Sequence, residues 1–317
     1  MNFDVKSRTI FKCLSGSHAY GTNTETSDKD YRGICIPPES YFLGAFHNFE
    51  QAESKPDPKN PDKEDSCIYG IRKFFKLAAD NNPNILELLF MPKDCILEMT
   101  PWMERIVEHR HKFLSTKVKF SYSGYAIAQL RRIKGHRAFL LNPQTKQPER
   151  ADFGLPANQD LVVFRKQVEM LNKAGIDANK VLGKQIEDEA RYQRAMEDWR
   201  HYQDWKENRN KTRAALESKF GVDLKHASHL VRLLRTGYEI LTEGELRVRR
   251  PDAAELLAIR NEGIWSYEKL IEFADKMDKE MERVYKAGES SLPHSPDINF
   301  LNDLCIEVVK DYLKING

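Results

Sequence analysis

Short apolar runs separated by turn residues fill the first hundred or so positions of the chain. Residues 8–14 (RTIFKCL) and 29–36 (KDYRGICI) are β-prone and stop at a Ser-Gly-Ser turn and a Pro-Pro pair, which predicts two strands. Residues 66–80 (SCIYGIRKFFKLAAD) begin extended and continue as a helix, because their later apolar residues recur at helical spacing. A Pro-rich polar loop is expected at 51–65. The alternation predicts a small sheet domain at residues 1–100.

From residue 101 onward the apolar positions follow a helical period. Residues 224–244 (LKHASHLVRLLRTGYEILTEG) form a strongly amphipathic pattern that ends at a glycine. Residues 266–288 (SYEKLIEFADKMDKEMERVYKAG) form another, with Ser266 as the expected N-cap. We therefore expect residues 101–317 to be a mainly helical domain.

Within this region, residues 157–220 are dense in charge and predict a charged helical insertion with one or two long, exposed helices. A row of large side chains recurs there at helical spacing: Tyr192, Met196, Trp199 and Tyr202. Such a row is more typical of docking onto the body of the protein or a second subunit than of ligand binding. The charged segment is thus where an oligomer could form.

The overall charge is nearly balanced, since 50 Lys and Arg face 48 Asp and Glu for a net charge of +2. This excludes a uniformly basic coat for nucleic acid but permits a local basic groove. Five cysteines without a CxxC pair argue against a disulfide framework or a zinc cage and favour a reducing compartment. No signal-peptide pattern and no apolar run of about eighteen residues occurs, so we expect a cytoplasmic protein without membrane contact.

The candidate chemistry lies in CLSGSHAYGTNTETSDKDYRGICIPP, which joins a Gly16–Ser17 turn to Asp28 and Asp30. On a strand the two aspartates would share one face, where their carboxylates repel unless a positive charge lies between them. Mg²⁺ prefers oxygen ligands of this kind. Glycine lets the backbone approach a phosphate closely. A metal ion at the carboxylates and a phosphate at the turn predict nucleotidyl transfer.

Two other interpretations of the aspartate pair compete with this one. An Asp-x-Asp pair is common on solvated surfaces. The sequence also matches a calcium-loop template at four positions, Asp28, Asp30, Gly33 and Glu39. Against the calcium loop, Arg32 stands where a ligand should be, Pro37–Pro38 would stiffen the exit, and no helical pattern flanks it.

These residues carry a family resemblance. LSGSHAYGTNTETSDKDYRG resembles the hG[GS]-x(9–13)-[DE]-h-[DE] signature of the DNA polymerase β-type nucleotidyltransferase superfamily. Its GSxAYG…SDxDxRG…PP form resembles, more narrowly, the nucleotidyltransferases associated with RNA ligases and RNA repair. The segments IRKFFKLAADNNPNILELLF, DFGLP and HLVRLLRTGYEIL are also similar to that family. The resemblance implies an α+β fold, in which a small mixed-sheet nucleotidyltransferase core precedes a mainly helical C-terminal region.

The resemblance also implies three carboxylates around two Mg²⁺ (or Mn²⁺) ions. Asp28 and Asp30 match the first two positions. The third is expected on a later strand, and Asp65 is our choice because it precedes the β-prone SCIY. Glu64 and Glu87 are the alternatives. In this scheme Asp28 and Asp30 bridge both metals, while Asp65 holds only the metal that activates the attacking hydroxyl.

Phosphate contacts are expected from the Gly16–Ser17 backbone and the Ser17 side chain. Arg32 either contacts the nucleotide's phosphates or neutralises the acidic pair. A basic row in the pattern at 224–244 is either solvated or in contact with phosphate or RNA: Lys225, His229 and Arg232. A second row fits core packing, with base stacking as its alternative: Tyr122, Tyr125, Gln129 and Arg132.

The sequence therefore predicts a metal-dependent nucleotidyltransferase that moves a nucleoside monophosphate from an NTP, ATP among them, to a hydroxyl. RNA is the favoured acceptor, tRNA included, because the resemblance points to RNA end processing or repair. Protein or small-molecule nucleotidylylation uses the same donor chemistry and is an alternative. A non-catalytic nucleotide- or RNA-binding module is the alternative from another class. The intact aspartate pair and Gly-Ser turn favour an enzyme over the latter.

Overall fold

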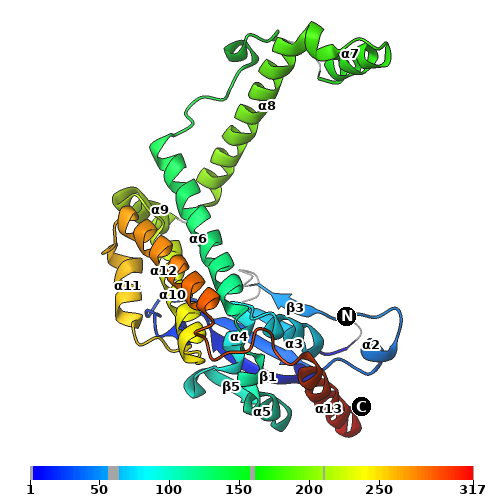
Figure 1. Cartoon of the computed structure of the whole chain (residues 1–317), viewed down its shortest axis with the longest axis vertical. Coiled ribbons are helices and arrows are strands. Elements are labelled where there is room, and N and C mark those ends of the chain that lie inside the picture. Colours follow the sequence, from blue (N-terminus) through cyan, green and yellow to red (C-terminus); the bar gives the residue numbers. More distant parts are fainter. Residues whose placement is uncertain (1–2, 56–63, 158–160, 210, 317) are drawn as a thin grey trace. The chain divides into compact units, whose positions relative to one another are not determined.

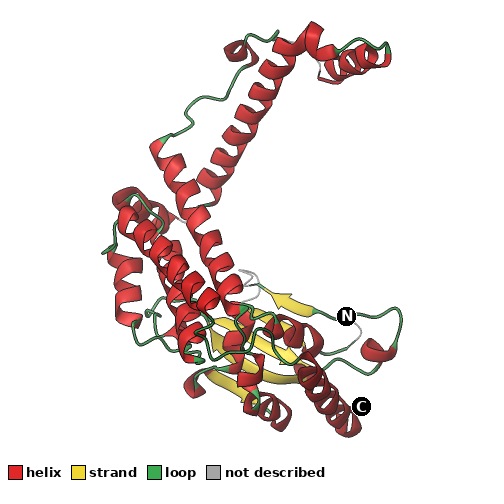
Figure 2. Ribbon diagram, in the orientation of Figure 1, coloured by secondary structure: helices red, strands yellow, loops and turns green. Residues whose placement is uncertain are grey.

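The computed structural model describes residues 3–55, 64–157, 161–209 and 211–316 (Figure 1). The chain divides into two compact units, residues 1–133 with 224–317, and residues 134–223. The first unit holds the sheet, whereas the second is built of helices and loops (Figure 2). Within the described ranges, no helix is long and apolar enough to cross a membrane.

A five-stranded mixed sheet forms the centre of the first unit. Its strands are β1 (Thr9–Ser15), β2 (Asp30–Cys35), β3 (Gln51–Ser54), β4 (Asp65–Gly70) and β5 (Ile96–Met99). The order across the sheet is β3-β4-β2-β1-β5, with β2 and β4 parallel and the other neighbours antiparallel. The predicted fold class is thus confirmed: a small mixed sheet precedes a mainly helical region.

The local predictions agree with this sheet at most positions. The strands expected at 8–14 and 29–36 are β1 and β2, and the segment 66–80 forms β4 followed by α3 (Ile71–Ala79). The Pro-rich stretch begins with β3 rather than a loop, because its first residues pair with β4 as an edge strand; residues 56–63 lie outside the described residues. β2 runs straight through Gly33, which rules out the calcium loop, since that loop turns sharply at this glycine.

Helices joined by loops surround the sheet in the described part of the first unit. The shorter ones are α1 (Ser17–Tyr20), α2 (Ser40–Leu43), α4 (Pro83–Leu89), α5 (Pro101–Glu108) and α11 (Ala253–Glu262). The longer ones are α10 (Leu224–Glu243), α12 (Tyr267–Ala287) and α13 (Ile298–Asn316), and α6 (Val118–Leu141) begins here. Three 3₁₀ turns cover Lys6–Arg8, Lys93–Cys95 and Arg110–Phe113.

The helix α10 is central to the packing of this unit, as its amphipathic pattern predicts. It packs against α11 and α12, while α13 packs against α3 and α5. Leu230, Leu234 and Leu241 recur along one side of α10 and are almost wholly buried. α12 begins where predicted, because the Ser266 hydroxyl accepts a hydrogen bond from the backbone N–H of Lys269 over 3.2 Å.

The second unit contains the end of α6 and the charged segment. Its further helices are α7 (Leu161–Lys173), α8 (Ala178–Asn208) and α9 (Lys211–Phe220), with a 3₁₀ turn at Arg150–Phe153. α8 is 31 residues long, yet it buries only Ala178, Glu189 and Tyr202. The prediction of long, exposed, charged helices is therefore confirmed for this helix.

Two members of the large-residue row on α8 pack inside the same unit. The Tyr202 ring lies 5.6 Å from the Phe139 ring, and the Tyr192 ring lies 5.7 Å from the Phe153 ring. Both pairs meet edge to face, the geometry that aromatic rings favour. These contacts lie within the helical unit itself, so docking of the row onto the body of the protein or onto a second subunit stays a prediction.

Candidate active site

Asp30 and Asp65 lie side by side at the start of two neighbouring strands. They are Cα partners in the parallel ladder of β2 and β4, and each is the first residue of its strand. Paired residues of adjacent strands point to the same face of a sheet, with the strands about 4.8 Å apart. The register thus places the predicted third carboxylate next to the predicted second one.

Asp28 lies outside this ladder. β2 begins at Asp30, so Asp28 belongs to the exposed loop before it rather than to a strand. Among the described side chains, Asp28, Asp30 and Asp65 do not form a group whose ligand oxygens all lie within 4.8 Å of one another. The fold therefore pairs two of the three aspartates through the sheet and leaves the third on a loop beside them.

The Gly16–Ser17 turn rests directly against Asp30. Gly16 precedes α1 with φ +66° and ψ −139°, a conformation that strongly favours glycine. A Cβ at this position would lie 2.7 Å from Asp30 Oδ2, so a larger residue would displace the carboxylate. The Ser15 hydroxyl donates to the Asp30 carbonyl oxygen over 3.0 Å and joins the two segments. The turn and the carboxylate that the motif combines are in contact in space.

The surroundings of Asp30 disfavour its charged form. Partial burial raises the pKa of Asp30 above its usual value. The charges of Asp65 and Asp28 raise this pKa further, whereas Arg32 and Lys225 lower it. A bound cation would relieve the repulsion among the three carboxylates, and their hard oxygens are ligands that Mg²⁺ and Mn²⁺ accept. The donor set therefore fits the expected divalent ions.

Arg32 lies beside this acidic pair. Its Nη1 is 3.8 Å from Asp65 Oδ1 and donates a hydrogen bond to the Tyr31 carbonyl oxygen over 2.8 Å. This position agrees with neutralisation of the carboxylates, one of the two roles predicted for Arg32. Contact with the nucleotide's phosphates stays a prediction.

The two alternative carboxylates have other partners. Glu64 is exposed and pairs with Lys12 Nζ at 2.8 Å. Glu87 is buried, and its two oxygens pair with Arg232 Nη1 at 2.5 Å and the Tyr20 hydroxyl at 2.7 Å. The Arg232 guanidinium also lies 3.8 Å from the centre of the Tyr20 ring. Glu87 and Arg232 thus tie α4 to α10 through a buried ion pair.

A cavity of ≈790 Å³ is lined mainly by α6 and α10. Its polar lining includes Tyr125, Gln129, Arg132, Lys225, His226 and His229. Arg232 contributes as well, so all three members of the predicted basic row face this space. The charge of Lys225, which lines this cavity, also lowers the pKa of Asp30.

His229 is uncharged in this cavity at neutral pH. Burial lowers the pKa of His229 from 6.5 to about 3, and the positive charges of Arg232 and Lys225 contribute to the shift. Within the basic row, Lys225 therefore presents a cation to the cavity, whereas the charge of Arg232 is paired with Glu87 and His229 is a neutral imidazole. A neutral imidazole can still donate or accept a hydrogen bond.

The sequence interpretation missed several residues of the cavity, among them Asn84 and His226. His226 Nδ1 lies 2.7 Å from Gln129 Oε1, so the two rows predicted on separate helices meet here. The helical spacing of both rows was the signal, but it did not show that the rows face each other. Tyr122 is buried in the core, as core packing predicts, whereas Tyr125 lines the cavity.

Comparison with known proteins supports the resemblance for the part of the chain that contains the sheet. Residues 2–146 match the RNA repair pathway DNA polymerase beta family. An uncharacterized 38.9 kDa protein from the nrdC-mobD intergenic region of Enterobacteria phage T4 is 32% identical over 146 residues. That alignment covers 44% of this chain and 43% of the phage protein, which is less than half of each. No solved structure matches the chain significantly.

Proposed function

We propose that the protein is a metal-dependent nucleotidyltransferase that moves a nucleoside monophosphate from an NTP to a hydroxyl group of RNA. The match of residues 2–146 to a polymerase β-type family named for RNA repair supports the reaction class at a coarse level. The observation that carries the proposal is the contact of Gly16 with Asp30, next to the Asp30–Asp65 pair. It supports binding of metal ions and a triphosphate at the same place.

In the proposed reaction, the acceptor hydroxyl oxygen attacks the α-phosphorus and forms a P–O bond. The bond between the α-phosphorus and the bridging oxygen to the β-phosphate breaks, and pyrophosphate leaves with that electron pair. Bound Mg²⁺ or Mn²⁺ would neutralise phosphate charge and lower the pKa of the attacking hydroxyl, whose proton passes to solvent. Asp28 and Asp30 would hold both ions, and Asp65 would hold the ion at the hydroxyl.

Other residues would bind and orient the nucleotide. The backbone after Gly16 would hold the β- and γ-phosphates, since first-turn N–H groups of a helix have no partner within it. Lys225 and Arg132 would neutralise phosphate charge from the cavity. Tyr125 offers a ring on which a base can stack.

The test compares wild type with Asp30→Asn, Asp65→Asn and the control Asp303→Asn, which changes an exposed aspartate on α13. Each protein is incubated with one α-³²P-labelled NTP at a time, Mg²⁺ or Mn²⁺, and a mixture of tRNA, RNA oligomers and protein. We expect label in RNA with wild type and Asp303→Asn. Asp30→Asn should lose at least about a hundredfold in rate, because a metal ligand contributes several kcal/mol to transition-state stabilisation.

Label in protein instead of RNA would establish protein nucleotidylylation and overturn the proposed acceptor. Metal-dependent NTP binding without label in any acceptor would favour the non-catalytic binding module. Transfer by Asp30→Asn at the wild-type rate would contradict the assignment of the site itself. Loss in Asp65→Asn but not in matched Glu64→Gln would identify the third carboxylate.

A further inference from the structure

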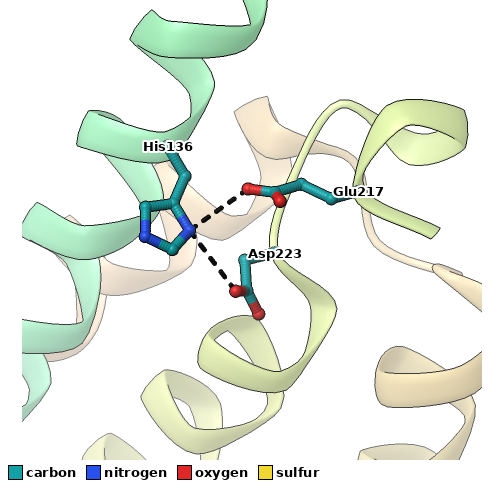
Figure 3. A group of neighbouring side chains, drawn as sticks. All are labelled: His136, Glu217 and Asp223. Atoms are coloured by element: carbon teal, nitrogen blue, oxygen red, sulfur yellow. Dashed lines mark ion pairs between the residues drawn. The ribbon is translucent and has the colours of Figure 1, made fainter. Parts of the chain in front are cut away.

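A second group of potential ligands lies in the helical unit, away from the aspartates in sequence. His136 of α6, Glu217 of α9 and Asp223, just before α10, point their polar atoms at one another (Figure 3). His136 Nδ1 lies 3.2 Å from Glu217 Oε1 and 3.4 Å from Asp223 Oδ2. The three ligand atoms all lie within 4.8 Å of one another, and both carboxylates are almost wholly buried.

The distances from His136 Nδ1 to the two carboxylate oxygens fit a metal ion bound by all three groups better than a proton shared among them. A charge-assisted N–H···O bond is about 2.7–2.9 Å long, and one N–H cannot point straight at two oxygens. An ion bound tetrahedrally through bonds of about 2.1 Å holds its ligand atoms about 3.4 Å apart. The two separations from His136 Nδ1 are close to that value. The nitrogen faces both carboxylates as a ligand would.

Glu217 supplies an independent observation. Its side chain is only 4% exposed, and no described residue donates a hydrogen bond to its Oε1, the oxygen directed at His136. Buried carboxylate oxygens nearly always have such a partner. Glu217 Oε2 accepts from Arg209 Nη2 over 2.7 Å, and Arg209 lies over the Trp205 ring at 4.1 Å. Arg209 thus orients the carboxylate and leaves Oε1 for a ligand.

We propose that His136 Nδ1, Glu217 Oε1 and Asp223 Oδ2 bind a Zn²⁺ ion, with water as its fourth ligand. An imidazole nitrogen with two carboxylates is a donor set that Zn²⁺ accepts readily, whereas Mg²⁺ prefers oxygen ligands alone. The site joins the two chain ends of the helical unit, because His136 is near its first residue and Asp223 is its last. A bound ion would link the two ends of the helical unit, restrict the unfolded chain between them and so stabilise the unit.

The competing account is an ion pair without a metal. The neighbouring carboxylates of Asp223 and Glu217 raise the pKa of His136 to about 9, so the metal-free imidazole is protonated and forms an ion pair with both. Both accounts place the same three side chains together. They differ in whether added Zn²⁺ binds at this place with a tetrahedral ligand field.

The experiment uses the full chain, treated with chelator and then titrated with ZnCl₂ against a chromogenic zinc indicator. The variants are His136→Asn and Glu217→Gln. The matched control is His201→Asn, an exposed histidine of α8, and Asp30→Asn separates this site from the proposed catalytic one. We expect one tight equivalent for wild type, His201→Asn and Asp30→Asn. His136→Asn and Glu217→Gln should bind that equivalent at least tenfold more weakly.

Co²⁺ in place of Zn²⁺ keeps the proposal testable if a variant fails to fold. Wild-type protein should give the intense visible bands of tetrahedral Co²⁺, and His201→Asn should give the same spectrum. Weak octahedral bands, or Zn²⁺ affinity in folded His136→Asn equal to that of wild type, would overturn the proposal. The cluster would then be an ion pair only. Both experiments measure metal binding and not enzymatic activity. Their outcome therefore does not depend on whether the proposed nucleotidyl transfer is correct.

Discussion

At Gly16 the backbone has φ +66° and ψ −139° while it touches the carboxylate of Asp30. Two independent features of this position favour glycine. The conformation is strained for any residue with a Cβ, and the space where a Cβ would go is taken by Asp30 Oδ2 at 2.7 Å. The position of Asp30 therefore depends on the absence of a side chain at Gly16.

Gly16→Ala should lower nucleotidyl transfer by at least about tenfold, because the new methyl group displaces Asp30, and cost about 1–3 kcal/mol of stability. The control is Gly288→Ala, since Gly288 also has a positive φ, +65°, but nothing lies within 4 Å of its Cβ position. That variant should lose stability without losing transfer. Label-transfer rates and urea unfolding measure the two effects. Equal activity of the two variants would contradict the role of the close contact.

His229 predicts a pH dependence of stability. Its pKa is 6.5 in the unfolded chain and about 3 in the folded one, because burial disfavours the imidazolium. Above pH 6.5 neither state holds the proton, so His229 has no effect. Below pH 6.5 the unfolded state binds a proton at His229 and the folded state does not. The free energy of unfolding therefore falls by up to about 1.4 kcal/mol per pH unit towards pH 3.

His229→Gln should remove this part of the acid sensitivity. Urea unfolding at pH 7.5, 6 and 5 measures it as a difference between wild type and variant, in which the other titrating groups cancel. The matched control is His201→Gln, which removes an exposed histidine. If wild type and His229→Gln lose stability in parallel as the pH falls, the imidazole is not held neutral by the fold.

At the level of elements, the buried pair of Glu87 and Arg232 connects α4 with α10. Both side chains are nearly inaccessible, at 6% exposure for Arg232 and 7% for Glu87. A buried charge without its partner is far more costly than the intact pair, or than an apolar pair of the same shape. The pair therefore specifies how these two helices meet more than it adds to stability.

Arg232→Met should destabilise the protein by about 3–5 kcal/mol, because it leaves the Glu87 carboxylate buried without a counter-charge. The double variant Glu87→Gln with Arg232→Met should recover part of that loss, since both charges are gone. Lys279→Met, which breaks an exposed pair with Asp275, serves as the control and should have little effect. Urea unfolding measures all three. A double variant that is no more stable than Arg232→Met alone would contradict the predicted coupling.

The parts of this arrangement that could be predicted are those encoded by neighbouring residues. Gly16 and Asp30 belong to one motif, and Asp65 could be inferred because it opens a β-prone run. Glu87 and Arg232 are 145 positions apart, and no local pattern shows that they meet, because that depends on how α4 packs against α10. The His136 cluster was missed for the same reason, and the predicted boundary at residue 100 stays a prediction.

For the whole molecule, the division into two compact units matters most. Each unit has its own set of packed side chains, and independently packed units can unfold independently. The helical unit includes a 31-residue helix with three buried residues, whereas the 20-residue α10 of the other unit buries twelve. The helical unit should therefore be the less stable of the two.

Calorimetry should accordingly show two transitions on heating, with the helical unit first. Zn²⁺ should raise the first transition and Mg²⁺ with a non-hydrolysable NTP the second, each by roughly 2–4 °C, because a ligand stabilises only the unit that binds it. His136→Asn should abolish the first shift and Asp30→Asn the second. A single transition that responds to both ligands would show that the two units unfold as one.

Because β2 and β4 pair in register, Asp65 is held opposite Asp30 by ladder hydrogen bonds and not by the length of chain that joins them. Insertions and deletions between the two strands can accumulate over evolution without moving either carboxylate. Homologues would then keep the pair while the interval between its members drifts. A pattern with fixed spacing would overlook Asp65 in such sequences. A single residue inserted within β4, after Asp65, would instead turn the side chains that follow it to the other face of the sheet.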